Sequence, residues 1–194
     1  MTERAAVQAV VLVSGSGTLL QAILDNQGQS YAVALVVADK DCPAVARAEK
    51  AGVPTQVVAV GGDRGQWNAQ LRDVVAAAAP DVVVSAGFMR ILGPEFLERF
   101  EGRLINTHPA LLPAFPGAHA VRDALAYGVK VTGTTVHYID EGVDTGEIIA
   151  QKAVEVLDGD TEERLHERIK EQERALIVEV LRRATTNDGK VTFP

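Results

Sequence analysis

The chain has 194 residues, 47% of them hydrophobic, and a formal net charge of −7 at pH 7. This length and composition predict one globular domain with a sizeable core and argue against a disordered chain. The acidic balance argues against a nucleic-acid or acidic-membrane surface as a partner, and therefore favours small molecules.

The N-terminal segment MTERAAVQAVVLVSG lacks a signal-peptide cleavage pattern, and its apolar run is too short to span a bilayer. The single cysteine, Cys42, cannot form an intramolecular disulfide. These features predict a cytoplasmic protein that does not bind membranes.

Apolar runs alternate with helical patterns along residues 7–107. The runs are continuous rather than alternating with polar residues, which is typical of parallel strands covered on both faces. The predicted strands are residues 7–13, 31–37, 55–60, 81–87 and 103–107, and the predicted helices are residues 18–26, 43–51 and 64–79. This alternation of βα units predicts an α/β, Rossmann-like, mostly parallel sheet with helices on both faces.

The pattern changes after residue 128. Residues 130–140 and 146–156 are two strand-like runs joined by the short loop EGVDT, which predicts a C-terminal antiparallel hairpin. A long closing helix follows. Asp160 and Glu163 form a capping-box pattern at its start, and its apolar stripe is Leu165, Ile169, Gln172, Leu176 and Val180.

Ligands of such sheets bind at the carboxyl ends of the strands, where the first candidate site is the glycine-rich turn VSGSGTLL. Its amides and the N-terminus of the next helix could hold an anion. The turn does not match a dinucleotide fingerprint, because Leu20 stands where the third glycine belongs, and no Gly-Lys-Ser/Thr follows. The phosphate of a small metabolite fits better, and the alternative is a plain tight turn.

A second candidate is AGFMRIL, where a buried strand ends in an arginine among large apolar residues. A flat, partly apolar ligand could lie there, with backbone groups contacting its polar edge. The alternative is that Met89, Ile91 and Leu92 continue the core and that Arg90 is solvated.

The third candidate is RLINTHPALLPAFPG. On a strand, Asn106 and His108 project from the same face, so an amide and an imidazole converge on one point. Pro109 keeps His108 extended, and Pro113 and Pro116 restrict the loop that follows. The alternative is a satisfied pair of polar residues in the core.

The fourth candidate is the acidic hairpin loop DEGVDTGE, which supplies Asp140, Glu141 and Asp144. One of these carboxylates could orient and charge the imidazole of His108. Asn, His and Asp together could stabilise the oxyanion of a carbonyl under attack.

Two other kinds of chemistry are disfavoured. No Ser or Cys lies in a nucleophile-elbow motif, so a covalent acyl intermediate is not indicated. A metal site built from His108, His119 and His137 lacks any HxH or HExxH spacing, so we expect no metal.

The segments NTHPALLPAFPG, AGFMRIL, SGSGT and GVDTGEII together resemble the folate-dependent formyltransferases, and among these the glycinamide ribonucleotide formyltransferases of purine synthesis. The resemblance extends from about Val7 to the final helix. Its Asn-x-His plus Asp set is shared with related hydrolases, whereas the glycine-rich turn and the length point to the purine enzyme. It implies transfer of a formyl group from 10-formyltetrahydrofolate, the co-substrate, to the amine of glycinamide ribonucleotide.

The resemblance also implies roles for individual residues. Asn106 and His108 would flank the formyl carbon, and Asp144 would pair with His108. The implied substrate-binding residues are Gly15, Ser16, Gly17, Thr18, Leu19, Lys170 and Glu173. The implied folate-binding residues are Arg64, Met89, Arg90, Ile91, Leu92, Asn106, Asp140, Glu141 and Val143.

The roles of Leu19 and of the Lys170 and Glu173 pair have alternatives, and the resemblance also implies one cis peptide bond. Many family members have Asn where this chain has Leu19, so the phosphate would be held through backbone amides. Lys170 and Glu173 share a helix face, and the alternative is that both are ordinary solvated charges. The Leu112–Pro113 peptide bond is expected to be cis.

We expect one formyltransferase domain over residues 1–194, as a monomer or a homodimer. About residues 1–100 would form its phosphate-binding half, about residues 101–185 its catalytic and folate-binding half, and residues 186–194 a tail. The alternative functions are hydrolysis of 10-formyltetrahydrofolate by water and a non-catalytic Rossmann-like nucleotide-binding module.

Overall fold

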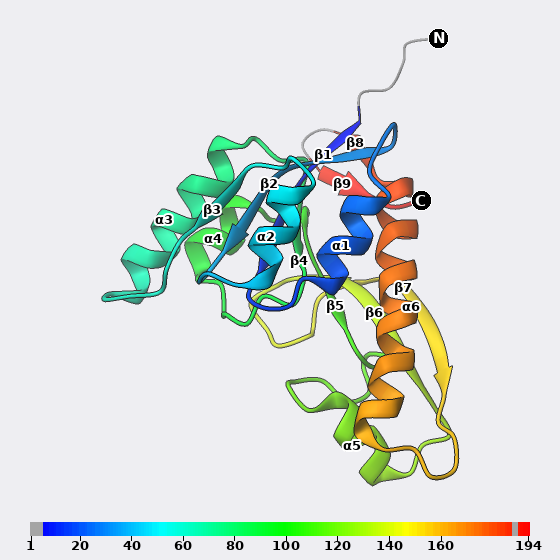
Figure 1. Cartoon of the computed structure of the whole chain (residues 1–194). Coiled ribbons are helices and arrows are strands. Elements are labelled where there is room, and N and C mark those ends of the chain that lie inside the picture. The colour runs from blue at the N-terminus through cyan, green and yellow to red at the C-terminus, as the bar shows by residue number, and fades with distance from the viewer. Residues whose placement is uncertain (1–5, 188–189) are drawn as a thin grey trace.

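Seven strands form one sheet in the order β3-β2-β1-β4-β5-β6-β7 (Figure 1). The computed structural model describes residues 6–187 and 190–194, so the first five residues of the N-terminal segment considered above lie outside it. The strands are β1 Val7–Val13, β2 Tyr31–Ala38, β3 Thr55–Val57, β4 Val82–Ser85, β5 Leu104–His108, β6 Val131–Tyr138 and β7 Ile148–Glu155. The first five pair in parallel, and β6 and β7 pair antiparallel.

Helices cover both faces of the sheet, as predicted. They are α1 Thr18–Asp25, α2 Pro43–Lys50, α3 Arg64–Ala77, α4 Pro94–Arg99, α5 Ala120–Tyr127 and α6 Glu162–Arg183. Helices α1, α2 and α6 pack against Val11 and Val13 of β1, whereas α3 and α4 pack against Val10 and Leu12 of the same strand. Continuous apolar strands therefore fill two cores at once.

The distal part of the β6–β7 hairpin is covered separately. Val121 of α5 packs with Val154 of β7 and with Leu165 and Ile169 of α6. Figure 1 shows α5 beside the N-terminal end of α6, away from the parallel strands. The long closing helix thus spans both the parallel part of the sheet and its antiparallel extension.

Several local predictions differ from the structure. Strand β3 ends at Val57 rather than at residue 60, because it is an edge strand that pairs only with β2. The six-residue α4 and the eight-residue α5 were not predicted. Residues 186–194, expected as a tail, include parts of two short antiparallel strands, β8 Thr185–Asn187 and β9 Lys190–Thr192, and Val191 is buried in the core.

The cap of α6 is also one residue later than predicted. Thr161, not Asp160, is the N-cap, and its Oγ1 accepts a hydrogen bond from the amide of Arg164 at 3.3 Å. Asp160 instead accepts from the amide of Leu157 and pairs with Arg168. The hydrogen bond from Arg168 is the largest cause that lowers the pKa of Asp160 to about 2.

The turn after β5 has the predicted backbone. The Leu112–Pro113 peptide bond is cis. The amide of Leu112 donates to the hydroxyl of Thr135 on β6, and that hydroxyl donates to the carbonyl of Ala110. The turn is therefore tied to the neighbouring strand beside the site.

Candidate active site

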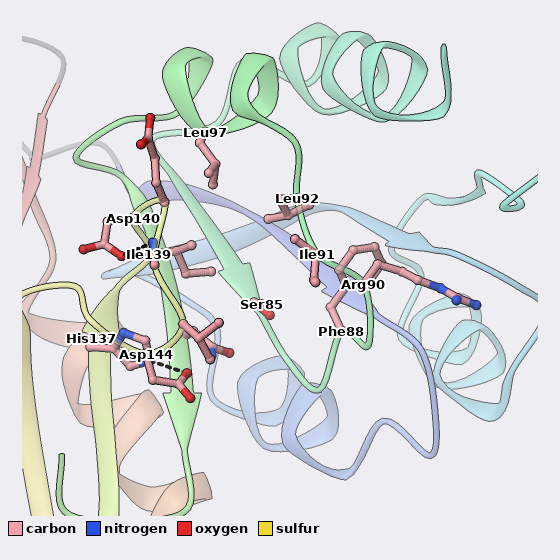
Figure 2. Close-up of a pocket in the computed structure, with 14 residues that line it drawn as sticks. Ser85, Phe88, Arg90, Ile91, Leu92, Leu97, His137, Ile139, Asp140 and Asp144 are labelled. Carbon is pink, nitrogen blue, oxygen red and sulfur yellow. Dashed lines mark hydrogen bonds and ion pairs between the residues drawn. The ribbon is translucent and has the colours of Figure 1, made fainter. Parts of the chain in front are cut away.

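Three polar side chains form a row across the middle of the sheet. Ser85 at the end of β4 is paired with Asn106 of β5, and Asn106 is paired with His137 of β6. Paired residues of neighbouring strands project to the same face. All three side chains line a pocket of about 210 Å³ (Figure 2).

The pocket is walled by two segments on either side of this row. One wall is the loop after β4 together with Leu97 of α4, and the other is the loop after β6. Figure 2 shows Leu97 and Leu92 on the opposite side of the pocket from His137 and Asp144. The remaining lining residues are Phe88, Arg90, Ile91, Ile139, Asp140, Glu141, Gly142 and Val143. The lining thus joins an apolar wall to a polar loop, as expected for a flat ligand with one polar edge.

Most of the expected folate-binding residues line this pocket, but Arg64 and Met89 do not. Arg64 donates from Nη2 to the carbonyl of Ile91 at 2.9 Å, and its guanidinium lies over the ring of Trp67. The side chain of Met89 is 76% exposed, and its amide donates to the hydroxyl of Ser14. Both residues support the loop that forms the wall rather than the pocket itself.

The wall is held by an ion pair. Arg90 Nε lies 2.6 Å from Oδ2 of Asp39, whose side chain is only 1% exposed. Arg90 is therefore paired and not simply solvated. Ile91 is 78% exposed at the rim of the pocket, whereas Leu92 is buried and belongs to the core.

His108 projects from the same face of β5 as Asn106, two residues further along the strand; it is 4% exposed and does not line the pocket. Its Nε2 lies 2.7 Å from the carbonyl oxygen of Phe115, and its Nδ1 lies 3.4 Å from Oδ2 of Asp144. Nε2 is thus engaged by a backbone carbonyl, and Nδ1 faces the carboxylate of Asp144. The structure thus brings His108 and Asp144 together, with the ring turned toward Phe115.

Asp144 lies between two imidazoles. Its Oδ2 accepts from the amide of Gly117 at 2.8 Å, and its Oδ1 lies 3.7 Å from Nε2 of His137. Its backbone has φ 55°, a left-handed conformation that is uncommon outside glycine and that Asp tolerates better than most residues. Asp140, in contrast, accepts from the amide of Gly142 and the hydroxyl of Thr145, so it shapes the loop.

His137 is one of the pocket residues that sequence reasoning missed. Its side chain is 2% exposed, and its Nδ1 lies 2.8 Å from the carbonyl of Tyr138. Nε2 is buried and has no hydrogen-bond partner. Burial lowers the pKa of His137, and the hydrogen bond to Tyr138 partly opposes this effect. Only the β5–β6 register, which the sequence does not give, places His137 beside Asn106.

The glycine-rich turn connects β1 to α1. Gly17 is the N-cap of α1 with φ 74°, and a Cβ there would lie 2.7 Å from Cα of Ala44. The carbonyl of Ser16 accepts from Nε of Arg47, which ties the turn to α2. Gly15, Ser16 and Thr18 are exposed, whereas the side chain of Leu19 packs against the core. Leu19 can therefore offer a ligand only its backbone.

The two expected substrate-binding residues on α6 have different surroundings. Glu173 accepts a hydrogen bond from the hydroxyl of Thr107, which projects from the face of β5 opposite to Asn106. Burial raises the pKa of Glu173, and the Thr107 hydrogen bond lowers it by less. Lys170 pairs with Glu167 at 2.8 Å. Glu173 is thus built into the back of β5, whereas Lys170 is engaged at the surface.

Within residues 6–187 and 190–194, no group of three or more His, Cys, Asp and Glu side chains is placed to hold a metal ion. His119 is exposed at the N-cap of α5. Over the same residues, no helix combines the length and apolar character that a membrane span requires.

Comparison with known proteins places this geometry in a family. A family model described as formyl transferase matches residues 7–181. The phosphoribosylglycinamide formyltransferase of Mycobacterium tuberculosis (strain H37Rv) is 56% identical over 178 residues, which cover 90% of this chain and 83% of that protein. The Escherichia coli (strain K12) protein of the same name is 40% identical over 173 residues, covering 86% and 82%.

A solved structure agrees. The crystal structure of glycinamide ribonucleotide transformylase 1 from Symbiobacterium toebii superposes with a TM-score of 0.88 at 42% identity, covering 97% of this chain and 94% of that chain. The resemblance noted in the sequence is therefore confirmed over nearly the whole fold. The chain belongs to the formyl transferase family.

Proposed function

We propose that the protein transfers the formyl group of 10-formyltetrahydrofolate to the amine of glycinamide ribonucleotide, a step of purine synthesis. The names of the relatives support this activity. The observation that carries it is the row of Ser85, Asn106 and His137 beside Asp144, at the base of a pocket with one apolar wall. Asn106 supplies an amide donor where a carbonyl oxygen would become negative.

The formyl-folate occupies the pocket. Its flat pterin lies against the apolar wall of Leu92 and Leu97, and its polar edge faces the loop that contains Asp140 and Asp144. The formyl group then lies near Asn106. Ile91, exposed at the rim, covers the part of the folate that leaves the pocket.

Glycinamide ribonucleotide approaches from the α1 and α6 side. Its phosphate binds the exposed turn of Gly15 to Thr18 at the N-terminus of α1, where the first turn has no acidic residue to repel it. Glu173 accepts from the substrate between this turn and β5. Lys170 is paired with Glu167, which compensates its charge, so it contributes little to binding the phosphate.

The chemistry is a direct transfer. The amine attacks the formyl carbon, a new C–N bond forms, and negative charge develops on the formyl oxygen. Asn106 and the imidazolium of His108 stabilise that charge. For this, the Nε2–H of His108 must leave the carbonyl of Phe115 and donate to the formyl oxygen instead. The bond between carbon and N10 of the folate then breaks, and N10 receives the proton that the amine loses.

The test is a spectroscopic assay of folate release with and without glycinamide ribonucleotide. We expect tetrahydrofolate to form only in the presence of the amine substrate, with one formylated product per folate. Release at the same rate without the amine would instead identify a hydrolase that uses water as the acceptor. No release under either condition would contradict catalysis of formyl transfer.

A further inference from the structure

The position of hydrogens on His137 follows from its surroundings. Nδ1 lies 2.8 Å from the carbonyl oxygen of Tyr138, so it must carry the proton in a neutral ring. Nε2 then has a free lone pair, and it is buried without a partner at 3.7 Å from Oδ1 of Asp144. Two acceptors therefore face one another across a short gap at the base of the pocket (Figure 2).

Few other groups in the site have a lone pair available for a proton. His108 does not line the pocket, and its Nε2 is already engaged by the carbonyl of Phe115. The amide nitrogen of Asn106 is not basic, and Asp140 is engaged by Gly142 and Thr145. Among the described residues that line the pocket, His137 Nε2 and Asp144 Oδ1 are the acceptors placed side by side next to Asn106.

We propose that His137 Nε2 accepts the proton that the attacking amine loses, with Asp144 Oδ1 holding the same N–H in place. This inference rests on the proposed formyl transfer. The proton leaves the nitrogen of the tetrahedral adduct, charges the ring of His137, and passes to N10 of the folate as the bond between carbon and N10 breaks. His108 remains the imidazolium that stabilises the oxyanion. The two histidines beside Asp144 therefore have different roles: His108 stabilises charge, and His137 accepts the proton.

The charges around His137 fit this role. Asp144 and Asp140 favour its protonated form, and His108 and burial oppose it, with burial the largest influence, so the pKa lies below the ordinary value of 6.5. The ring is then neutral at pH 7 and able to accept a proton. A neutral imidazole is also a stronger base in water than a carboxylate. Turnover should fall as the pH drops through this lowered pKa.

Two substitutions separate the functions of the ring. In His137→Asn, the amide nitrogen can still donate to the Tyr138 carbonyl, but nothing replaces Nε2. In His137→Gln, an amide oxygen can accept a hydrogen bond near the position of Nε2, but it cannot take up a proton. We expect both variants to lose about 10²-fold in kcat with changes in either KM of less than about threefold. The acidic limb of the pH profile should be lost in both.

His166→Asn is the matched control, because His166 is a partly buried histidine on α6 whose pKa burial also lowers, and it does not line the pocket. It should keep wild-type turnover. Melting midpoints and binding of the folate establish that the variants are folded. Wild-type kcat in His137→Gln would overturn proton acceptance, because an acceptor of hydrogen bonds alone would then suffice.

Nitrogen-15 NMR of the wild-type imidazoles provides a test that needs no variant. We expect His137 to be neutral at pH 7 and protonated on Nδ1. A charged ring, or a neutral ring protonated on Nε2, would overturn the inference. If the wild-type protein does not transfer formyl groups at all, the proposed function fails instead, and the two failures are distinguishable.

Discussion

At the scale of single residues, the site is built around one carboxylate with two imidazole neighbours. Oδ2 of Asp144 faces His108 and Oδ1 faces His137, while the amide of Gly117 donates to Oδ2. A carboxylate held from three sides has little freedom to rotate, so each imidazole keeps its own oxygen. The left-handed backbone of Asp144 is part of this arrangement, since another φ would turn the side chain away.

The first prediction concerns Asn106 and His108. His108→Ala should lower kcat by about 10²- to 10⁴-fold, because the positive donor to the oxyanion is lost. Asn106→Ala should lower kcat on the order of 10²- to 10³-fold through the loss of an amide donor. Steady-state kinetics on folded protein measure both effects.

The control is His119→Ala, which removes an exposed imidazole outside the pocket and should keep normal turnover. If the Asn106 and His108 pair served the core alone, the two variants would melt earlier and turn over normally. Near wild-type kcat in folded His108→Ala protein would therefore remove this residue from the mechanism.

The second prediction concerns the free energy of unfolding and Glu173. Burial raises the folded-state pKa of Glu173 above its ordinary value of 4.5, so the ionised side chain destabilises the fold at neutral pH. Glu173→Gln keeps an acceptor for the hydroxyl of Thr107 without the charge. It should raise the melting midpoint at pH 7 by roughly 1–3 °C.

The raised pKa of Glu173 also determines how the stability difference between Glu173→Gln and wild type changes with pH. A raised pKa means that the folded state holds its proton more tightly than the unfolded state. The advantage of Glu173→Gln should therefore shrink as the pH falls through the raised folded-state pKa toward 4.5, and it should be absent below 4.5, where the wild-type carboxyl is neutral in both states. Glu171→Gln, an exposed position on the same helix, is the control. A lower midpoint for Glu173→Gln than for wild type at pH 7 would contradict this account.

At the scale of elements, the sequence predicted what depends on local patterns. The continuous apolar runs located the five parallel strands, and the strand alternation placed Asn106 and His108 on one face. The α6 cap was misplaced by one residue because Asp160 and Thr161 are both good caps, and the pairing of Asp160 with Arg168 decides between them. That pairing is a tertiary contact that no local pattern reveals.

The parts of the site that were not predictable depend on strand register and loop geometry. His137 adjoins Asn106 only because of the β5–β6 pairing, and Ser85 adjoins it only because of β4–β5. Arg64 and Met89, which the resemblance implies as folate-binding residues, do not line the pocket, and each contacts the loop that forms its wall. Family resemblance placed these residues near the ligand, but it could not say which way each side chain points.

The third prediction concerns the N-terminus of α1. Gly17 is a poor position for a test, since any side chain there would clash with Ala44 and disturb α2. Thr18 is exposed at the first helical position. Thr18→Asp should weaken binding of glycinamide ribonucleotide by at least about tenfold, because its carboxylate competes with the phosphate for the helix N-terminus.

Calorimetric titration of both ligands measures this effect, with Thr18→Asn as the uncharged control of the same shape. Folate binding should be unchanged, and the melting midpoint should not fall, since an acidic first turn favours the helix. Equal losses for the two ligands would indicate a general disturbance of the fold and would contradict a phosphate site at this turn.

At the scale of the whole molecule, one sheet connects the two ligand sites. The glycine-rich turn follows β1, and the pocket lies at β4, β5 and β6, so the continuous order β1-β4-β5-β6 links them. Helix α6 packs on α1 and also carries Glu173 behind β5. Under the proposed function, each substrate would therefore contact the same body of packed elements.

The fourth prediction follows from this arrangement. A ligand that binds only the native state stabilises it, by about 2.7 kcal/mol at a concentration of 100 Kd. For a chain of this size, that corresponds to a rise in melting midpoint of roughly 5–10 °C. We expect glycinamide ribonucleotide and a non-reactive folate analogue each to produce such a rise, measured by thermal unfolding. Stabilisation by the folate analogue alone would support the hydrolase instead.

The continuity of the sheet also bears on how the protein becomes active after synthesis. The backbone of the glycine-rich turn is local, because residues 14–17 join β1 directly to α1. The row of Ser85, Asn106 and His137 requires a parallel pairing and an antiparallel pairing between distant segments. Distant pairings form late because closing long loops is entropically unfavourable. A refolding chain should therefore regain its secondary structure before its turnover, and recovered turnover reports that the last strands have docked.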